Sequence, residues 1–533
     1  MMTIRTAIKF RLKAPTDVEN FIIFELARKK LVQLTVPEEQ LKEINVKKEK
    51  EKYYELKNRL KELCDELFIR RLKKASLDEI IAYLDVSKIE EDLEKFRKKI
   101  DESLVKVAAE IDYSKIEELS RLTADIFKKR EELAKEFYPI ACKINTALDA
   151  LIKIADMKQY ARRENAKYTF LEGWVLEDKI SELNSVLSTI EKRHKVNISV
   201  EYEKKAEYLE EAPTRMVAPR ALSPFASITR QMGTPAAYEI DPTPIVWFFW
   251  ILMFGLMFPD FGQGIILILM GLFIMKKKEF FGFSGKKVGI LLVWGGIIAS
   301  ISGLLLGEIF MVEVKPLLPG LHEGWVEEPE YILQLLKIAI LFGMFQILVG
   351  LILGMFINIK RKEYLEAVFG VRGIAGILLF LGLIFFGAKF LGALIPRNIR
   401  EAPWFLNLSI GMLALSIIMI MILPKLEKGL SFSDAFGELI EAALAFIANT
   451  FSYIRLAGFA LVHLMLAVTV TKILVATVPL WIKGLMAVLL NFIALTIELL
   501  VVAIQSTRLV LYEFFTKFYH GVGKVFRPIS IEI

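Results

Sequence analysis

The sequence predicts a polytopic α-helical membrane protein of about eight transmembrane helices, the last two long and tilted. An N-terminal cytoplasmic coiled-coil hairpin with a small α+β lobe is predicted to precede them. Three observations lead to this class. Of 533 residues, 54% are of the AVILMFWYC types, which exceeds the globular norm. The first 240 or so are rich in Lys, Glu and Arg, whereas Leu, Ile, Phe, Gly and Met dominate the rest. Two arginines, Arg455 and Arg508, lie inside apolar stretches.

The N-terminal region begins with a strand signal and continues with helices. Thr3–Lys13 alternates like a strand, and Asp17–Lys30 has apolar residues at helical spacing. Two charged helical runs follow at about 46–72 and 87–157. Apolar residues recur every three or four positions in the second run, which fits a coiled-coil seam or an ordinary solvated helix pair. They are Ile89, Leu93, Phe96, Ile100, Leu104, Val107 and Ile111. Pro139 predicts a kink or a helix boundary.

A compact α+β lobe is predicted around residues 167–205, before a proline-containing segment that leads to the apolar half. Its expected elements are a strand at Lys167–Leu176, a helix at Asp178–His194 and a strand at Val196–Glu203. We therefore assign residues 1–235 to a cytoplasmic domain and residues 236–533 to a membrane domain.

Eight apolar spans make up the membrane domain. They cover about 244–259, 261–275, 288–307, 331–357, 367–395, 405–423, 435–473 and 485–519. The first two are shorter than the ~20 residues that a spanning helix needs, so we expect a helical pair meeting near Asp260. Each of the last two is long enough for a single helix of roughly 55 Å. In a hydrocarbon core of ~30 Å such a helix must tilt or project from the bilayer.

Charge and cysteine usage predict the topology and exclude several functions. Basic clusters such as Lys276–Lys278 and Lys360–Lys362 flank one end of the spans, and the opposite loop at Glu308–Glu330 is acidic. By the positive-inside rule we expect both termini of this multi-pass protein to be cytoplasmic, with the cell membrane as its location if the source is prokaryotic. This placement also explains the net charge of +7 without nucleic-acid binding. Cys64 and Cys142 have no disulfide-framework spacing, which fits a reducing compartment.

Neither a nucleotide site nor a metal site is expected on this chain. The run GFSGKK at Gly282–Lys287 lacks both the glycine spacing and the final Ser or Thr of a phosphate loop. The chain has only four His, and they show no metal-ligand pairing. We expect no cofactor.

Polar residues form stripes on the last two spans. At 100° per residue the six on the seventh span fall within an arc of about 120°, and the four on the eighth within about 80°. The six are Glu438, Glu441, Asn449, Ser452, Arg455 and His463, and the four are Glu498, Gln505, Arg508 and Tyr512. An intramembrane arginine costs roughly 2.5–3.5 kcal/mol on insertion scales, which favours a functional role. The alternative is that these groups only bind helices together.

Three sequence blocks resemble one family, the membrane-embedded stator subunit of archaeal and vacuolar-type rotary ATPases, called subunit a or I. The blocks are NTFSYIRLAGFALVH at Asn449–His463, IELLVVAIQSTRLVLYEFFTKFY at Ile497–Tyr519, and Gly233–Gly264. The phrase FLEGWV is similar to the membrane-proximal lobe of that family. A distal lobe of the family would have to fit in Phe68–Val86, so we expect it to be reduced or absent.

The resemblance implies a non-catalytic, ion-translocating subunit that couples H⁺ or Na⁺ flow to ATP synthesis or hydrolysis on other subunits. It implies that Arg455 faces the ion-binding carboxylate of a rotor subunit. Half-channel positions are implied for Arg508, Glu441, His463, Glu498 and Gln505, with Glu438 and Ser452 on the same stripe. The implied partners are a rotor proteolipid ring, peripheral stalk subunits, a central stalk rotor-cap subunit and the lipid bilayer.

Two rival functions are compatible with a membrane protein of this composition. A secondary transporter would show internal repeats and interrupted mid-membrane helices, and no convincing repeat is visible here. A membrane-anchored scaffold would use the helical hairpin for assembly only, and Arg455 would then be dispensable.

Overall fold

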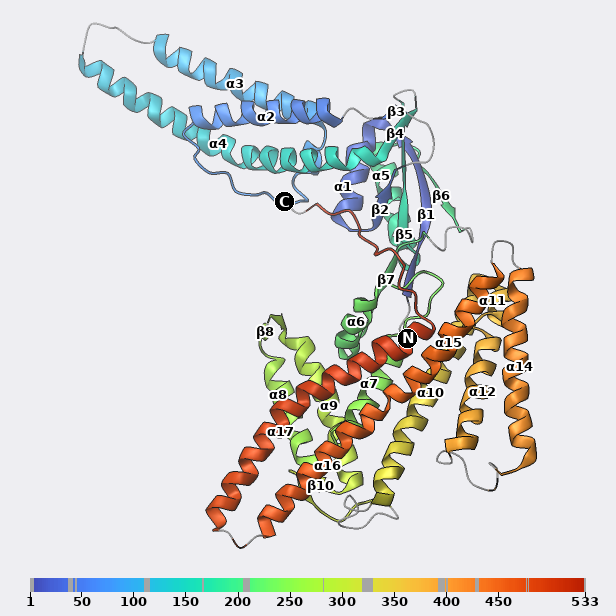
Figure 1. The fold of residues 1–533 in the computed structure, drawn as a ribbon. Coiled ribbons are helices and arrows are strands. Elements are labelled where there is room, and N and C mark those ends of the chain that lie inside the picture. The colour runs from blue at the N-terminus through green and yellow to red at the C-terminus, as the bar shows by residue number, and fades with distance from the viewer. Residues whose placement is uncertain are drawn as a thin grey trace. The chain divides into compact units, whose positions relative to one another are not determined.

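The computed structural model describes residues 4–36, 42–43, 46–109, 116–164, 167–204, 211–280, 282–318, 329–391, 398, 401–426, 431–475, 477 and 479–531. These residues form two compact units (Figure 1). The N-terminal unit comprises residues 5–213 and 525–533, and the membrane unit comprises residues 1–4 and 214–524. The boundary between the units therefore precedes the one we drew from composition at residue 235.

The N-terminal unit combines an antiparallel sheet with long helices. Its strands are β1 (Ile4–Pro15), β2 (Val32–Thr35), β3 (Lys42–Glu43), β4 (Ala161–Glu164), β5 (Tyr168–Leu176) and β6 (Ser199–Glu203), and its helices are α1 (Glu19–Arg28), α2 (Val46–Glu66), α3 (Val86–Ala109), α4 (Ile116–Met157) and α5 (Ile180–His194). The strand order is β3-β4-β5-β1-β6, and β2 also pairs with β5. Phe10 of β1 lies opposite Gly173 of β5 and Tyr202 of β6. The strands and helices predicted for the α+β lobe are confirmed.

The helical part of this unit differs from a simple two-helix hairpin. The run predicted over 87–157 is two helices, α3 and α4, which pack on each other, and α2 also packs on α4. The described part of the predicted seam is buried, and Phe96 contacts Phe137 with ring centroids 4.8 Å apart. The seam side chains at 104, 107 and 111 lie outside the described residues. Helix α4 continues through Pro139, which therefore marks no boundary.

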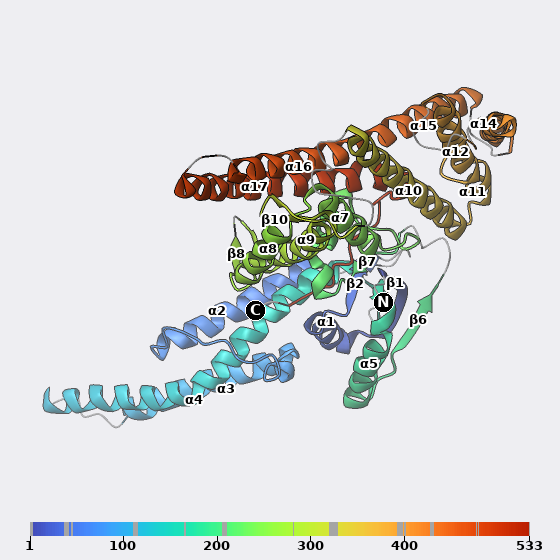
Figure 2. The same ribbon diagram turned by 90° about the horizontal axis from the view of Figure 1, so that it is seen from below.

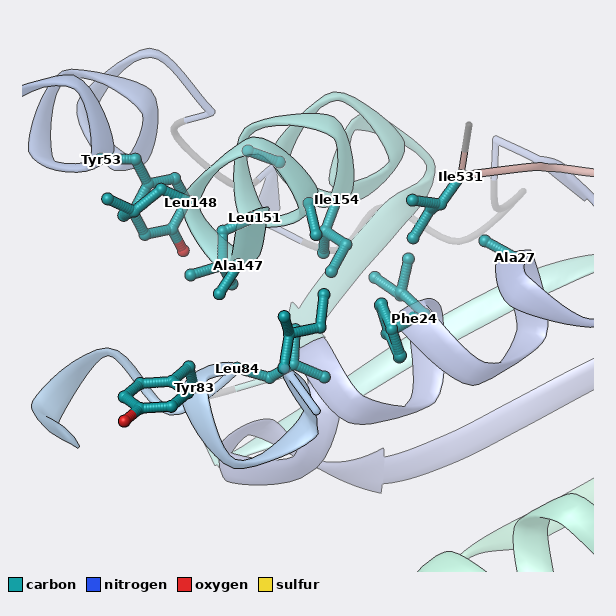
Figure 3. Close-up of a cluster of buried hydrophobic side chains, with 14 of the residues drawn as sticks. Phe24, Ala27, Tyr53, Tyr83, Leu84, Ala147, Leu148, Leu151, Ile154 and Ile531 are labelled. Atoms are coloured by element: carbon teal, nitrogen blue, oxygen red, sulfur yellow. The ribbon is translucent and has the colours of Figure 1, made fainter. Parts of the chain in front are cut away.

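One hydrophobic core holds the N-terminal unit together. Figure 3 shows side chains from α1, α2 and α4 gathered there, with Phe24, Tyr53 and Leu148 among them. The segment between α2 and α3 contributes Leu67, Ile80, Tyr83 and Leu84 to this core, so those residues form no separate lobe.

The last residues of the chain return to the N-terminal unit. Ile529 donates its backbone N–H to Val32 O on β2 at 2.9 Å, and Arg527 donates to the side chain of Gln33 at 2.8 Å. Ile531 is buried in the core that Figure 3 draws. The N-terminal domain and the C-terminal tail are thus one folded body.

The membrane unit is almost entirely helical. Its elements are β7 (Thr214–Met216), α6 (Ser223–Thr229), α7 (Thr243–Met257), α8 (Phe261–Ile274), β8 (Glu279–Phe280), β9 (Phe283–Ser284), α9 (Gly285–Leu306), β10 (Glu308–Ile309), β11 (Val312–Glu313), α10 (Pro329–Arg361), α11 (Tyr364–Phe369), α12 (Ile374–Leu391), α14 (Pro403–Leu426), α15 (Phe432–Ser452), α16 (Ile454–Val475) and α17 (Leu480–Arg508). A π-helical turn at Leu509–Phe514 follows α17.

Within the described residues, six helical segments are long and apolar enough to cross a membrane. They are Gly285–Leu306, Glu330–Arg361, Tyr364–Lys389, Trp404–Ile422, Phe432–Val475 and Leu480–Lys517. Two shorter apolar helices, Thr243–Met257 and Phe261–Ile274, correspond to the helical pair predicted near Asp260. A polytopic helical membrane protein is therefore confirmed.

Helices α8 and α9 approach each other through glycines spaced seven residues apart. Gly264 and Gly271 of α8 lie against Gly296 and Gly289 of α9, and a Cβ atom added at Gly296 would come within 2.6 Å of Gly264 O. Small residues permit this close backbone approach, which drives helix association where lipid supplies no hydrophobic effect.

We expect Gly296→Leu to destabilise the membrane unit, because overpacking a close contact costs about 1–3 kcal/mol or more. Thermal unfolding in detergent measures the effect. Gly411→Leu on α14 is the matched control, since nothing lies within 4 Å of a Cβ atom at Gly411. Equal unfolding temperatures for the two variants would contradict the close contact.

We expect Cys64 to be nearly inert in the folded protein. Burial raises the pKa of its thiol to about 11, and a thiol with this pKa instead of 9.0 is about 100-fold less ionised at pH 8. In a Cys142→Ser background, iodoacetamide should modify Cys64 at least that much more slowly before unfolding in urea than after it. Similar rates would show that the core around α2 opens readily.

Candidate ion-translocation site

The predicted site residues lie on the last three helices. Helices α16 and α17 are side by side in both views (Figures 1 and 2), and α15 continues the line of α16. The line of α15 and α16 is interrupted near Arg455, and the helix α17 is interrupted at Arg508. The side chain of Tyr453, between α15 and α16, is fully buried against Gly343 of α10. On the other line α17 passes into the π turn directly after Arg508. The seventh span is therefore two helices and not the single helix that its sequence permits.

Arg455 is paired but not enclosed. Its Nε donates to Ser452 O at 3.1 Å, and its Nη2 donates to Glu513 Oε1 at 2.8 Å. The side chain of Glu513 is 6% exposed, whereas that of Arg455 is 29% exposed. An arginine has five N–H donors, and these two bonds use only part of the guanidinium. The side chain is therefore neither fully hydrogen-bonded within the described residues nor fully buried.

The pair with Glu513 explains how the chain tolerates this cation in a spanning segment. A buried ion pair offsets the desolvation of both groups only with good geometry, and removing one partner leaves an uncompensated charge. Arg455 donates a hydrogen bond to one carboxylate oxygen of Glu513 at 2.8 Å. The other carboxylate oxygen has no hydrogen-bond partner in the described residues. Within the described residues, Glu513 thus accepts a hydrogen bond from Arg455 through Oε1, and its Oε2 accepts none.

A second polar cluster surrounds His463. The imidazole is fully buried, and its Nδ1 lies 2.5 Å from Glu498 Oε2 on α17. Its Nε2 lies 3.3 Å from Glu308 Oε2, and Glu308 is itself only 2% exposed. The ring of Phe258 covers the imidazole at a centroid distance of 4.9 Å. One titratable ring therefore lies between two carboxylates, hydrogen-bonded to Glu498 and within ion-pair distance of Glu308.

Asp260 positions the strand pair that carries Glu308. Its Oδ1 accepts hydrogen bonds from Gln263 N at the start of α8 and from Phe310 N, and its Oδ2 accepts one from Met311 N at 2.6 Å. Phe310 and Met311 have φ values of 51° and 58°, in the left-handed region that non-glycine residues seldom adopt. The buried carboxylate of Asp260 thereby stabilises the β10–β11 turn.

Two spanning helices also hold the β10–β11 hairpin. Glu313 N donates to Thr471 Oγ1 of α16 at 3.1 Å, and Asn491 of α17 donates to Phe310 O at 3.0 Å. Asn491 in turn accepts a hydrogen bond from Gln263 of α8 at 2.8 Å. These bonds fix Glu308 against His463.

The other predicted residues have different surroundings. Glu438 and Glu441 are exposed on α15, and Ser452 Oγ donates to Ala448 O. Gln505 is partly buried on α17, and its Oε1 has no hydrogen-bond partner in the described residues. Arg508 is exposed and makes no ion pair with the described residues, although its charge acts on Glu513. Glu498 contacts His463.

Two functional candidates, Glu513 and Glu308, were absent from the sequence prediction. A regular α-helix would turn Glu513 about 140° away from Arg508, and the π turn changes that angle. Glu308 follows a spanning helix directly, and no residue spacing connects it to His463. An acidic residue in or beside an apolar span is costly in itself, and this signal could have drawn attention to both.

Comparison with known proteins points to one family. Residues 83–290 match the V-type ATPase 116kDa subunit family. The A-type ATP synthase subunit I of Saccharolobus solfataricus is 25% identical over 481 residues, covering 78% of this chain and 68% of the relative. The proteins of the same name from Pyrococcus horikoshii and Methanocaldococcus jannaschii are each 26% identical, covering 78% of this chain and 62% and 63% of those relatives. The chain thus spans roughly two thirds of the length of these relatives. It is a homologue of the A-type ATP synthase subunit I proteins, and the resemblance drawn from its sequence is confirmed.

Proposed function

We propose that this chain is the membrane-embedded stator subunit of an A/V-type rotary ATPase. With a ring of carboxylate-bearing rotor subunits it translocates H⁺ or Na⁺, and nucleotide chemistry takes place on other subunits. The observation that carries this proposal is the guanidinium of Arg455, which is 29% exposed on a spanning segment and has one carboxylate partner. The similarity to A-type ATP synthase subunit I proteins supports the assignment to an A-type ATP synthase.

Arg455 acts on the rotor through its charge. A cation close to a carboxylate favours the ionised form, so a rotor carboxylate arriving beside Arg455 releases its ion. The same fixed charge repels a cation that would otherwise pass straight between the two half-channels. Glu513 compensates Arg455 when no rotor carboxylate is beside it, and the unused donors of the guanidinium receive the incoming group.

The remaining site residues line the two access paths. Glu438 and Glu441 precede Arg455 on the exposed side of α15 and supply carboxylates for one half-channel. The cluster of Glu308, His463 and Glu498 supplies the other, because His463 lies eight residues, or roughly 12 Å of helix, beyond Arg455. Three further polar residues would serve as contacts for ions or water along these helices. They are Ser452, Gln505 and Arg508.

The termini support a topology with both ends on the cytoplasmic side. Because Ile529 pairs with β2 of the N-terminal unit, the chain enters and leaves the membrane on one side. Such a topology needs an even number of crossings. Within the described residues, the six long spans and the two short apolar helices make eight. By the positive-inside rule, the basic loops support a cytoplasmic location for that side. There the N-terminal unit would contact the peripheral stalk and the rotor cap of the central stalk, and α15 to α17 would lie tilted against the ring.

We expect Arg455→Ala to abolish ATP-driven ion uptake by the reconstituted complex, because no cation then discharges the rotor carboxylate. Leaving Glu513 buried without its partner should also cost about 3–5 kcal/mol of stability. The double variant Arg455→Ala with Glu513→Gln removes that unpaired charge. Its thermal stability should recover while its ion uptake stays lost.

The double variant separates transport from structure. If Arg455 serves only to pair with Glu513, ion uptake and stability recover together in the double variant, and the proposed function is wrong. Subunit composition after purification is the control, because uptake is interpreted only for complexes that contain every subunit.

We expect Glu308→Gln to slow ion uptake severalfold without loss of assembly, because the amide preserves shape but cannot exchange a proton with His463. Glu313→Gln is the matched control, since Glu313 lies opposite Glu308 in the hairpin register. The measurement is the initial rate of ATP-driven uptake in proteoliposomes. Equal rates in the two variants would remove Glu308 from the path.

A further inference from the structure

An apolar cavity of about 360 Å³ lies between three helices of the membrane unit. Its walls come from α10, α12 and α15, and it is lined by Met344, Phe380, Leu383, Ile384, Phe386, Gly387, Ala388, Phe446, Ile447, Thr450 and Phe451. Phe380 and Phe446 meet edge to face inside this group, with ring centroids 5.4 Å apart. The volume is within the range of small-molecule pockets.

The lining offers no group that would hold water or a polar ligand. Among the described lining residues Thr450 alone has a polar side chain, and its hydroxyl donates to Phe446 O at 2.7 Å within its own helix. A water molecule needs two to four polar partners, and apolar cavities stay dry. The occupant must therefore be apolar.

The cavity opens outward from segments that span the bilayer. Each of the three wall helices belongs to a candidate span. Phe386, Ile447 and Phe451 at the rim are 38%, 44% and 51% exposed. The α12 residues of the wall end at Ala388, directly before Lys389. A lysine near the end of a spanning helix reaches the polar interface, so the cavity lies within the leaflet where α12 ends.

We infer that this cavity binds one hydrocarbon chain of a membrane phospholipid. Its depth places it among lipid chains, its walls offer only dispersion contacts, and its open rim admits a chain from the surrounding leaflet. The inference stands apart from the proposed ion translocation, since none of the lining residues is a site residue.

The bound chain holds α15 against α10 and α12 next to the break at Tyr453. Phe446, on the cavity wall, has the ammonium group of Lys517 over its ring at 4.9 Å. The wall is thus in contact with the end of the last span as well as with α12. An empty cavity would lack packing partners on one side.

Gly387 supplies a way to fill the cavity from within. A Cβ atom at this position meets nothing within 4 Å, and Gly387 lines the cavity, so Gly387→Leu adds a side chain there. Gly411→Leu on α14 is the same change at an equally open position that does not line the cavity. Ile447→Trp narrows the rim from the opposite wall, which gives a second variant that leaves α12 unchanged.

The test uses the full complex in nanodiscs that contain a phosphatidylcholine with a diazirine at the end of one acyl chain. After irradiation, mass spectrometry locates the adducts. We expect selective labelling of the peptides that contain Phe380–Ala388 and Phe446–Phe451 in the unmodified protein and in Gly411→Leu. The labelling should fall to the level of other lipid-facing helices in Gly387→Leu and in Ile447→Trp.

Two outcomes would overturn the inference. Unchanged labelling in both filling variants would show that lipid only surrounds these helices. No selective labelling of these peptides in the full complex would show that no acyl chain occupies the cavity there. Neither result depends on ion uptake, so the lipid site and the proposed function are tested separately.

Discussion

A cation inside a hydrocarbon layer needs an anion or water beside it, and the rest of the membrane unit is arranged around this requirement. Arg455 meets it with Glu513 at 2.8 Å, yet keeps part of its guanidinium at the surface. A completely enclosed pair would be inert, and an unpaired cation would not insert at acceptable cost. The structure lies between these limits, because Arg455 is paired with Glu513 and its side chain is still 29% exposed.

Local irregularities of the helices bring the pair together. A single residue, Tyr453, separates α15 from α16 and packs against Gly343, where any side chain would clash. The π turn after Arg508 changes the direction in which Glu513 points. Insertions of this kind recur at functional sites because they redirect side chains without ending the helix. In lipid they are tolerated where neighbouring protein satisfies the backbone groups that they release.

The buried carboxylate of Asp260 supports the polar cluster around His463 without contacting His463 itself in the described hydrogen bonds. Asp260 accepts three backbone N–H groups and thereby fixes a hairpin with two left-handed residues, which places Glu308 beside His463. The close approach of α8 and α9 through glycines holds Asp260 in turn, since a Cβ atom at Gly303 would strike Phe261 N and the backbone of Asp260. The packing of α8 on α9, the β10–β11 turn and the polar cluster around His463 are therefore one connected arrangement.

The sequence by itself determined which segments enter the membrane, where the N-terminal strands and helices lie and which family the chain resembles. These are local properties: hydropathy over about 20 residues, periodicity and contiguous motifs. It also singled out Arg455, His463 and Glu498, because charge in an apolar span is costly wherever the chain goes. Tertiary structure decided the partnerships. The pairing of Arg455 with Glu513 depends on a break and a π turn in separate spans. The contact of His463 with Glu308 joins residues 155 positions apart through a hairpin, and the fold of 87–157 into α3 and α4 depends on packing against α2. Such contacts arise from packing between distant segments, which no pattern along a single helix records.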